Sequence, residues 1–225
     1  MKIGVLIPTR DRPEFLEQAK RLLKAQTRQP NELLIVDTQS HFKGKDLNWR
    51  YRIGTEYLFN KGMDCIVLWE DDDWYCPKYI ELMTEAWSLH RSDLFGLSNT
   101  IYYHLKSSRY QIISHPGRSS AMSMVIGRGL MDYDPPKDND INYDIYYSKI
   151  ISDSIFISTE KVLNLGIKHG QGTCGGQGHS VNLSGYSKDI SLNNYNSEAF
   201  SDDDGFLESV TGKDYDFYKG IKERL

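Results

Sequence analysis

Apolar residues in the first 90 positions alternate between continuous runs and helical spacing. Three continuous runs are typical of strands buried on both faces of a parallel sheet. They are Ile3–Ile7, Leu33–Val36 and Cys65–Trp69. Three amphipathic stretches follow these runs in turn. They are the segment that opens at Pro13-Glu14, then Leu47–Asn60 and Pro77–Leu89. Asp11 is the expected N-cap of the first of these. Strands that alternate with helices in this way predict an α/β fold, with a parallel sheet and helices on its faces.

The second half of the chain is less regular. Its strand-like runs are Leu94–Tyr103, Tyr110–Ser114, Ser120–Ile126 and Ile150–Ser158. The first two flank a polar turn and predict a hairpin. Six glycines lie within Gly166–Gly178, which predicts a flexible loop over a bound ligand. The tail from Ser201 is either a docked helix or an ordering lid.

The third apolar run ends abruptly in four acids, Glu70–Asp73, which we call the acidic segment. Four adjacent carboxylates repel one another, and a divalent cation among them relieves that repulsion. Mg²⁺ and Mn²⁺ prefer carboxylate oxygen, and Mg²⁺ usually shares its coordination shell with substrate phosphates. The acidic segment therefore predicts a metal–diphosphate site at the C-terminal end of a strand. The alternative is a solvated acidic turn.

Polar residues follow all three N-terminal strands. They are Thr9-Arg10 after the first, Asp37 after the second and the acidic segment after the third. Ligands of open α/β sheets bind at the carboxyl ends of the strands, so these residues are expected to meet in one crevice. Residues 1–62 carry five more basic than acidic side chains, which suits an anionic small molecule. A pI near 5.9 argues against a general nucleic-acid footprint.

Composition adds modest constraints. A chain of 225 residues with 39% hydrophobic content is long enough for one complete α/β core. No apolar run approaches the roughly 18–20 residues of a membrane span, and we expect no signal peptide. The three cysteines lack CxxC spacing and are interpreted as free thiols. We therefore expect a soluble, cytoplasmic protein.

Three motifs together resemble the nucleotide-sugar glycosyltransferases of the GT-A fold, in particular the inverting group called family 2. They are Ile3–Leu16, Leu34–Ser40 and Glu70–Pro77. The resemblance covers roughly the first 90 residues and is weak beyond them. It implies a single GT-A (Rossmann-like) domain with a mainly parallel sheet flanked by helices. Residues 1–92 would bind the nucleotide sugar, 93–200 would form a less regular acceptor-binding half, and 201–225 a tail or lid.

The resemblance implies transfer of a sugar from a nucleoside-diphosphate sugar, in our expectation UDP-linked, to an acceptor hydroxyl with inversion. It also implies Mn²⁺ or Mg²⁺ as cofactor. Asp72 and Asp73 are the expected metal ligands; an alternative register would pair Asp71 with Asp73. Glu70 stands where the family normally has Asp, and the usual acidic pair on the acceptor side is not present in its usual form.

Donor contacts are expected from the strand ends. The residues assigned to nucleotide-sugar binding are Pro8, Thr9, Arg10, Arg12, Asp37, Glu70 and Asp71. The two arginines have the guanidinium fork that pairs well with a diphosphate. Their alternative role is surface ion pairing with neighbouring acids. For Asp37 the alternative is a turn-forming residue.

The remaining candidates lie in or near the acceptor half. An inverting transfer needs a general base, for which Asp144 is the first candidate and Asp140 the second; each has the alternative of a solvated loop acid. His169 is a candidate metal ligand, with an ordinary loop histidine as its alternative. Trp74 and Tyr75 would stack against an acceptor, or else belong to the core.

The acceptor and the oligomeric state remain open. The acceptor could be a saccharide, a lipid-linked glycan, a protein or a hydroxylated base in phage-type DNA. A sugar-phosphate nucleotidyltransferase is an alternative, although the loop Thr9–Pro13 lacks the glycines that such enzymes usually carry there. A non-catalytic binding protein on a transferase scaffold is another, and loss of the acids, which are intact here, would mark it.

Overall fold

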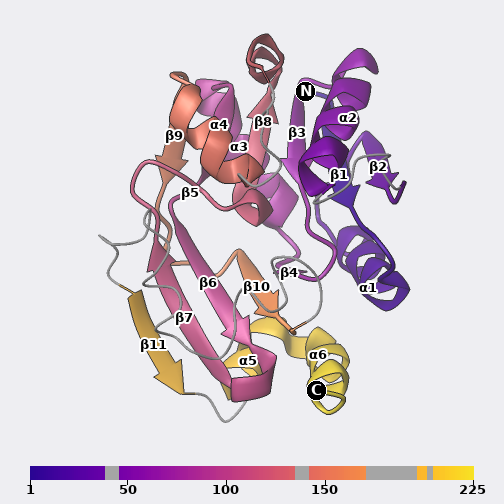
Figure 1. Cartoon of the computed structure of the whole chain (residues 1–225), viewed down its shortest axis with the longest axis vertical. Coiled ribbons are helices and arrows are strands. Elements are labelled where there is room, and N and C mark those ends of the chain that lie inside the picture. Colours follow the sequence, from indigo (N-terminus) through magenta and orange to yellow (C-terminus); the bar gives the residue numbers. More distant parts are fainter. Residues whose placement is uncertain (39–45, 135–141, 171–196, 202–204) are drawn as a thin grey trace.

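The computed structural model describes residues 1–38, 46–134, 142–170, 197–201 and 205–225, and their strands form two sheets (Figure 1). The six-stranded sheet has the order β2-β1-β3-β8-β5-β9. Its strands are β1 (Ile3–Pro8), β2 (Glu32–Val36), β3 (Cys65–Leu68), β5 (Leu94–Leu97), β8 (Met124–Gly127) and β9 (Ser154–Ile157). β1 is parallel to β2 and β3, and β5 is parallel to β9. β8 is antiparallel to both of its neighbours.

Helices cover both faces of this sheet. They are α1 (Pro13–Lys24), α2 (Leu47–Asn60), α3 (Tyr79–His90) and α4 (Tyr143–Ile150), with short 3-10 turns at Ala121–Ser123 and Arg128–Asp132. Successive side chains of a strand point to opposite faces, and β1 follows this rule. Val5 and Ile7 belong to the hydrophobic cluster that α1 and α3 complete, whereas Leu6 belongs to the cluster completed by α2 and α4.

The second sheet has the order β11-β7-β6-β10-β4. Its strands are β4 (Trp74–Tyr75), β6 (Asn99–His104), β7 (Arg109–Ser114), β10 (Asn164–Lys168) and β11 (Ser197–Ser201). β6 and β7 form the predicted hairpin around a 3-10 turn at Leu105–Ser107. β10 is parallel to β6 and antiparallel to β4, which directly follows the acidic segment. This pairing brings β10, which lies about 90 residues later in the sequence, next to the segment that follows β3.

The C-terminal tail forms two helices, of which α6 (Tyr215–Lys222) docks on α1 and α5 (Gly205–Thr211) stacks Phe206 on Tyr110 of β7. They are joined by a 3-10 turn at Gly212–Asp214. Phe217 packs edge-on against Phe15 with ring centroids 5.9 Å apart. Arg224 donates to Glu14 at 2.7 Å across the same contact. Within the described residues, no helix combines the length and hydropathy needed to cross a membrane.

The structure confirms the α/β class and reproduces the helix Leu47–Asn60, but three local predictions were wrong. The run Leu94–Tyr103 is two strands in different sheets, separated at Ser98. The predicted glycine-rich loop is wrong for its first residues, because Gly166 lies inside β10, where a Cβ would lie 2.5 Å from the Tyr102 ring; residues 171–178 of this segment lie outside the described residues. Asp11 does not cap α1, since Arg12 occupies the N-cap position without a side-chain cap.

Gly54 allows α2 to approach β1. A Cβ at this position would lie 2.3 Å from Leu6 Cδ1. We expect Gly54→Ala to lower the free energy of unfolding by about 1–3 kcal/mol, because overpacking a close helix–strand contact displaces backbone or side chains.

Gly220→Ala is the matched control for this substitution. Gly220 lies in α6, and its Cβ would meet no atom within 4 Å. Alanine there should raise the free energy of unfolding by about 0.5–1 kcal/mol through helix propensity. Urea unfolding of both variants gives the comparison, and equal effects would contradict the packing explanation.

Candidate functional site

The acidic segment turns away from the end of β3 into the interior. Asp71 is 1% exposed, Asp72 7% and Asp73 1%. Burying three carboxylates costs free energy unless hydrogen bonds or cations compensate. The interpretation as a solvated acidic turn was therefore wrong.

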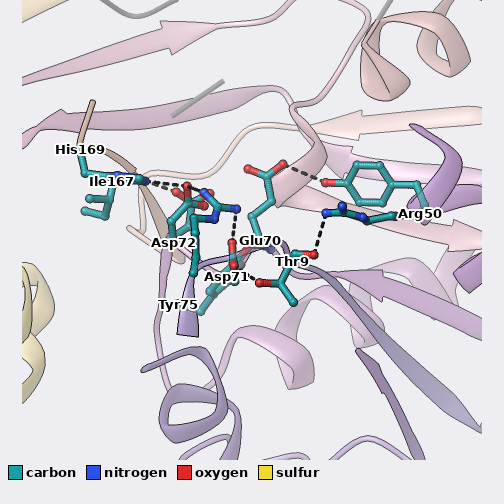
Figure 2. Close-up of polar contacts among 11 residues, drawn as sticks. Thr9, Arg50, Glu70, Asp71, Asp72, Tyr75, Ile167 and His169 are labelled. Carbon is teal, nitrogen blue, oxygen red and sulfur yellow. Dashed lines mark hydrogen bonds and ion pairs between the residues drawn. The ribbon is translucent and has the colours of Figure 1, made fainter. Parts of the chain in front are cut away.

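Three of the four acids converge. One carboxylate oxygen each from Glu70, Asp72 and Asp73 lies within 4.8 Å of the others. Asp71 points away from this group, and its Oδ2 accepts a 2.5 Å hydrogen bond from Thr9 Oγ1 (Figure 2). The structure thus brings together Glu70, Asp72 and Asp73. Asp71, which the alternative register pairs with Asp73, is not a member of this group.

Arg12 bridges the two middle acids from the loop after β1. Its Nη1 donates to Asp72 Oδ2 at 2.6 Å, and its Nη2 donates to Asp71 Oδ1 at 2.5 Å. Burial opposes the charge on Arg12, but Asp72 and Asp71 outweigh burial and raise the pKa of the guanidinium. Arg12 therefore supplies positive charge to the buried acids.

β10 and the residue that follows it supply the other partners. His169 Nε2 lies 2.9 Å from Asp72 Oδ2, and its ring is fully buried against Phe15, with centroids 4.4 Å apart. The backbone N–H of Ile167 donates to Asp73 Oδ1 at 2.8 Å. Asp73 Oδ2 is buried and has no hydrogen-bond partner among the described residues.

Charge is distributed unevenly over the acidic segment. Burial, reinforced by Asp72, raises the pKa of Asp71 to about 7 and raises the pKa values of Glu70 and Asp73. Burial acts on Asp72 in the same direction, but Arg12 and His169 together hold its pKa well below the usual range. Asp72 is thus the anionic centre of the group.

The residues present fit a divalent cation. Three converging carboxylates offer the hard oxygen ligands that Mg²⁺ and Mn²⁺ prefer, and a neighbouring imidazole suits Mn²⁺. The buried, unpartnered Asp73 Oδ2 is an oxygen that a cation would satisfy. Glu70, Asp72 and Asp73 are the residues able to hold it, and His169, the predicted fourth ligand, lies beside them in contact with Asp72.

A buried arginine that the sequence analysis missed, Arg50, holds the loop after β1. Arg50 donates to the Thr9 carbonyl at 2.6 Å and to Asp46 Oδ2 at 2.7 Å. Arg10 also donates to Asp46, at 3.1 Å, and has no contact with the acidic segment among the interactions described. The signal that could have found this pair is the spacing of Asp46 and Arg50 at i and i+4, at the start of a helix.

The two other predicted donor residues lie at strand ends. Pro8 is buried as the last residue of β1, next to Thr9. Asp37 follows β2 and is exposed. The carboxyl end of the sheet thus carries Pro8 and Asp37 as expected, without a contact between Asp37 and the acidic segment among the interactions described.

Asp144 lies in the first turn of α4, and its Oδ2 accepts a 3.3 Å hydrogen bond from Arg118 Nη1. Burial raises the pKa of Asp144 to about 6; Arg118 opposes this rise, and the charge of Glu70 adds to it. No direct contact between Asp144 and the acidic segment is among the interactions described. The second base candidate, Asp140, lies outside the described residues.

Trp74 and Tyr75 belong to the core. They form β4, and Tyr75 stacks on Trp69 with ring centroids 3.9 Å apart. Tyr75 Oη accepts a hydrogen bond from the Glu70 N–H at 2.8 Å, so it braces the acidic segment. Neither residue is exposed as an acceptor-stacking platform.

Tyr51 is a second brace that the sequence analysis missed. Its hydroxyl donates to Glu70 Oε1 at 2.9 Å, and its ring packs on Tyr143, with centroids 4.8 Å apart. Helical spacing marks Tyr51 as a core residue, and no sequence signal links it to Glu70.

No protein-family model matches the sequence, and no curated protein is detectably similar to it. Among solved structures, TarS of S. aureus is similar. For its residues 1–349 the TM-score is 0.50 at 13% identity, covering 75% of this chain and 61% of that one. A second TarS structure gives 0.51 at 14% identity, covering 74% of this chain and 37% of TarS. A glycosyltransferase involved in glycosylation of the major capsid of PBCV-1 gives 0.49 at 10% identity, covering 74% and 94%. The similarity to TarS confirms the predicted GT-A fold.

Proposed function

We propose that the chain is a metal-dependent glycosyltransferase that moves a sugar from a nucleoside-diphosphate sugar to an acceptor hydroxyl. The observation that carries this proposal is the buried group of Glu70, Asp72 and Asp73 at the end of β3, beside Arg12 of the β1 loop. It lies at the carboxyl edge of the sheet, where open α/β folds bind their ligands. The GT-A fold supports the same reaction class by analogy.

Different residues of the site have different proposed roles in binding the cation and the diphosphate. A bound Mn²⁺ or Mg²⁺ would supply Lewis-acid stabilisation of the charge that develops on the leaving diphosphate. Glu70, Asp72 and Asp73 would hold the cation, His169 would orient Asp72 through its 2.9 Å contact, and the fork of Arg12 would pair with diphosphate oxygens. The buried position of the acids excludes water, which strengthens these electrostatic interactions.

Asp144 is the proposed general base. As the acceptor oxygen bonds to the anomeric carbon, Asp144 takes the hydroxyl proton, and the bond from that carbon to the diphosphate oxygen breaks. A single displacement of this kind inverts the anomeric configuration. Arg118 positions the carboxylate through its 3.3 Å contact.

The finer assignments are also proposals. We propose a UDP-linked donor and membership of family 2, acting in the cytoplasm on a glycan or, as a second acceptor class, a hydroxylated base in DNA. The division into a donor half, an acceptor half and a C-terminal segment remains part of the proposal. The nucleotidyltransferase alternative ranks lower because the loop Thr9–Pro13 contains no glycine.

Activity should depend on pH through Asp144. The group must be deprotonated to accept a proton, and its pKa is about 6 because burial raises it. We therefore expect kcat to be nearly constant above pH 7 and to fall about tenfold for each pH unit below 6. A pH–rate profile at saturating donor and metal tests this. An acidic limb near pH 4 would contradict the assignment.

Release of nucleoside diphosphate tests the proposed reaction. Each of a panel of UDP-, GDP- and dTDP-sugars is incubated with the protein and Mn²⁺, with and without candidate acceptors. We expect one donor to be consumed, slowly without acceptor and not at all with EDTA. Formation of pyrophosphate from a nucleoside triphosphate and a sugar phosphate would instead identify a nucleotidyltransferase. No turnover of any donor would favour a binding protein.

A further inference from the structure

Asp72 Oδ2 already has two partners. Arg12 Nη1 lies 2.6 Å from it and His169 Nε2 lies 2.9 Å from it. A carboxylate oxygen offers two lone pairs, so both are engaged. A cation that binds Asp72 through this oxygen must therefore displace one of the two side chains.

The two side chains differ in their freedom to move. His169 is fully buried and packed against Phe15. The side chain of Arg12 is 22% exposed and reaches the acids from a loop, where Asp11 adopts a positive φ of 54°. Arg12 is thus the partner that can leave without disturbing the core.

Once Arg12 leaves the acids, the diphosphate of the donor is the anion that it can pair with. A diphosphate on a cation held by Glu70, Asp72 and Asp73 would lie beside the β1 loop, and guanidinium forks match phosphate oxygens. Arg10 in the same loop is paired with Asp46 and, among the interactions described, does not contact the acids. Arg12 is therefore the guanidinium of this loop that faces the proposed diphosphate.

We infer that Arg12 is an exchangeable counter-cation, which neutralises Asp71 and Asp72 before the metal binds and transfers to the donor diphosphate once the metal has displaced it. This inference rests on the proposed function. It implies that the metal alone binds weakly, because it must displace Arg12, and that a diphosphate recovers this cost through its contact with Arg12. Such coupling is reciprocal, so metal and diphosphate strengthen one another's binding.

Calorimetric titration with Mn²⁺ alone, and then with preformed Mn²⁺–pyrophosphate, tests this inference. We expect Arg12→Gln to bind Mn²⁺ alone about tenfold more tightly than the wild type, and to bind Mn²⁺–pyrophosphate about tenfold more weakly. Arg10→Gln is the matched control, since it removes an exposed guanidinium of the same loop that does not contact the acidic segment. It should leave the affinity for Mn²⁺ alone unchanged.

Arg12→Lys separates displacement from simple charge repulsion. Lysine keeps the charge but lacks the fork that bridges Asp71 and Asp72, so we expect it to bind Mn²⁺ alone more tightly than the wild type. This variant also decides the question if Arg12→Gln does not fold. Equal Mn²⁺ affinity in the wild type and both Arg12 variants would overturn the inference and leave the proposed function standing. Failure of every form, including the wild type, to bind Mn²⁺ would overturn both.

Discussion

Asp72→Asn is expected to abolish turnover while the protein remains folded. The amide removes the anionic centre of the group that would hold the cation, and Arg12 keeps its contact with Asp71 at 2.5 Å. Replacing a residue outside the ligand shell of a metal typically costs about 10–100-fold, so loss of a ligand should cost more than about 100-fold in kcat. Steady-state kinetics at saturating Mn²⁺, with circular dichroism as the check on folding, measure this.

Asp64→Asn is the matched control for this substitution. Asp64 is an exposed acid just before β3 that accepts a hydrogen bond from the Lys2 N–H at 2.7 Å. It should retain wild-type turnover. A kcat near the wild-type value for Asp72→Asn would show that the acidic segment does not bind a metal that the reaction needs.

Asp144→Asn is expected to lower kcat by about 10²–10⁴-fold, the range for loss of a general base, with little change in donor affinity. The amide can still accept the Arg118 hydrogen bond, so local packing should survive. Single-turnover kinetics and donor titration separate the chemical step from binding. The acidic limb of the pH–rate profile near pH 6 should disappear as well.

Asp153→Asn is the control for the base. Asp153 is an exposed acid near the end of α4, and its carboxylate accepts a hydrogen bond from the Asp93 N–H at 3.2 Å. It should turn over as the wild type does. A collapse of donor binding in Asp144→Asn, with the intrinsic rate preserved, would mean that Asp144 is a donor-binding residue and a different group is the base.

The N-terminal half of the fold could be predicted because its signals are local. β1 and β3 are buried on both faces, which requires continuous apolar runs, and α2 has an uninterrupted helical pattern. The acidic segment stands out because four adjacent carboxylates need compensation. These features depend on neighbours in sequence.

The features that could not be predicted depend on distant partners. The Ile167 N–H reaches Asp73 across 94 positions, and Arg12 reaches Asp72 across 60. Ser98 divides an apparently continuous run because the strands on either side of it join different sheets. No periodicity encodes such pairings, which form only when β10 packs between β6 and β4.

The role of Trp74 and Tyr75 could not be predicted for the same reason, because it depends on distant partners. Aromatic residues after a metal motif suit a stacking platform as well as a core, and their composition cannot distinguish the two. The structure places them under the acidic segment, where the Tyr75 hydroxyl orders the Glu70 backbone. Their contribution is to hold the acids in place.

A thermal-shift comparison of nucleotides and nucleotide sugars with Mn²⁺, with Mg²⁺ and with EDTA tests the central claim most directly. The claim is that the acidic segment binds a nucleoside diphosphate through a divalent cation. A ligand at about 100 times its Kd should add roughly 2.7 kcal/mol to the free energy of unfolding, which is a visible rise in Tm. We expect one nucleotide to produce this rise in the wild type with Mn²⁺ and to lose it in EDTA and in Asp72→Asn. A rise that persists in EDTA, or that Asp72→Asn retains in full, would contradict the account.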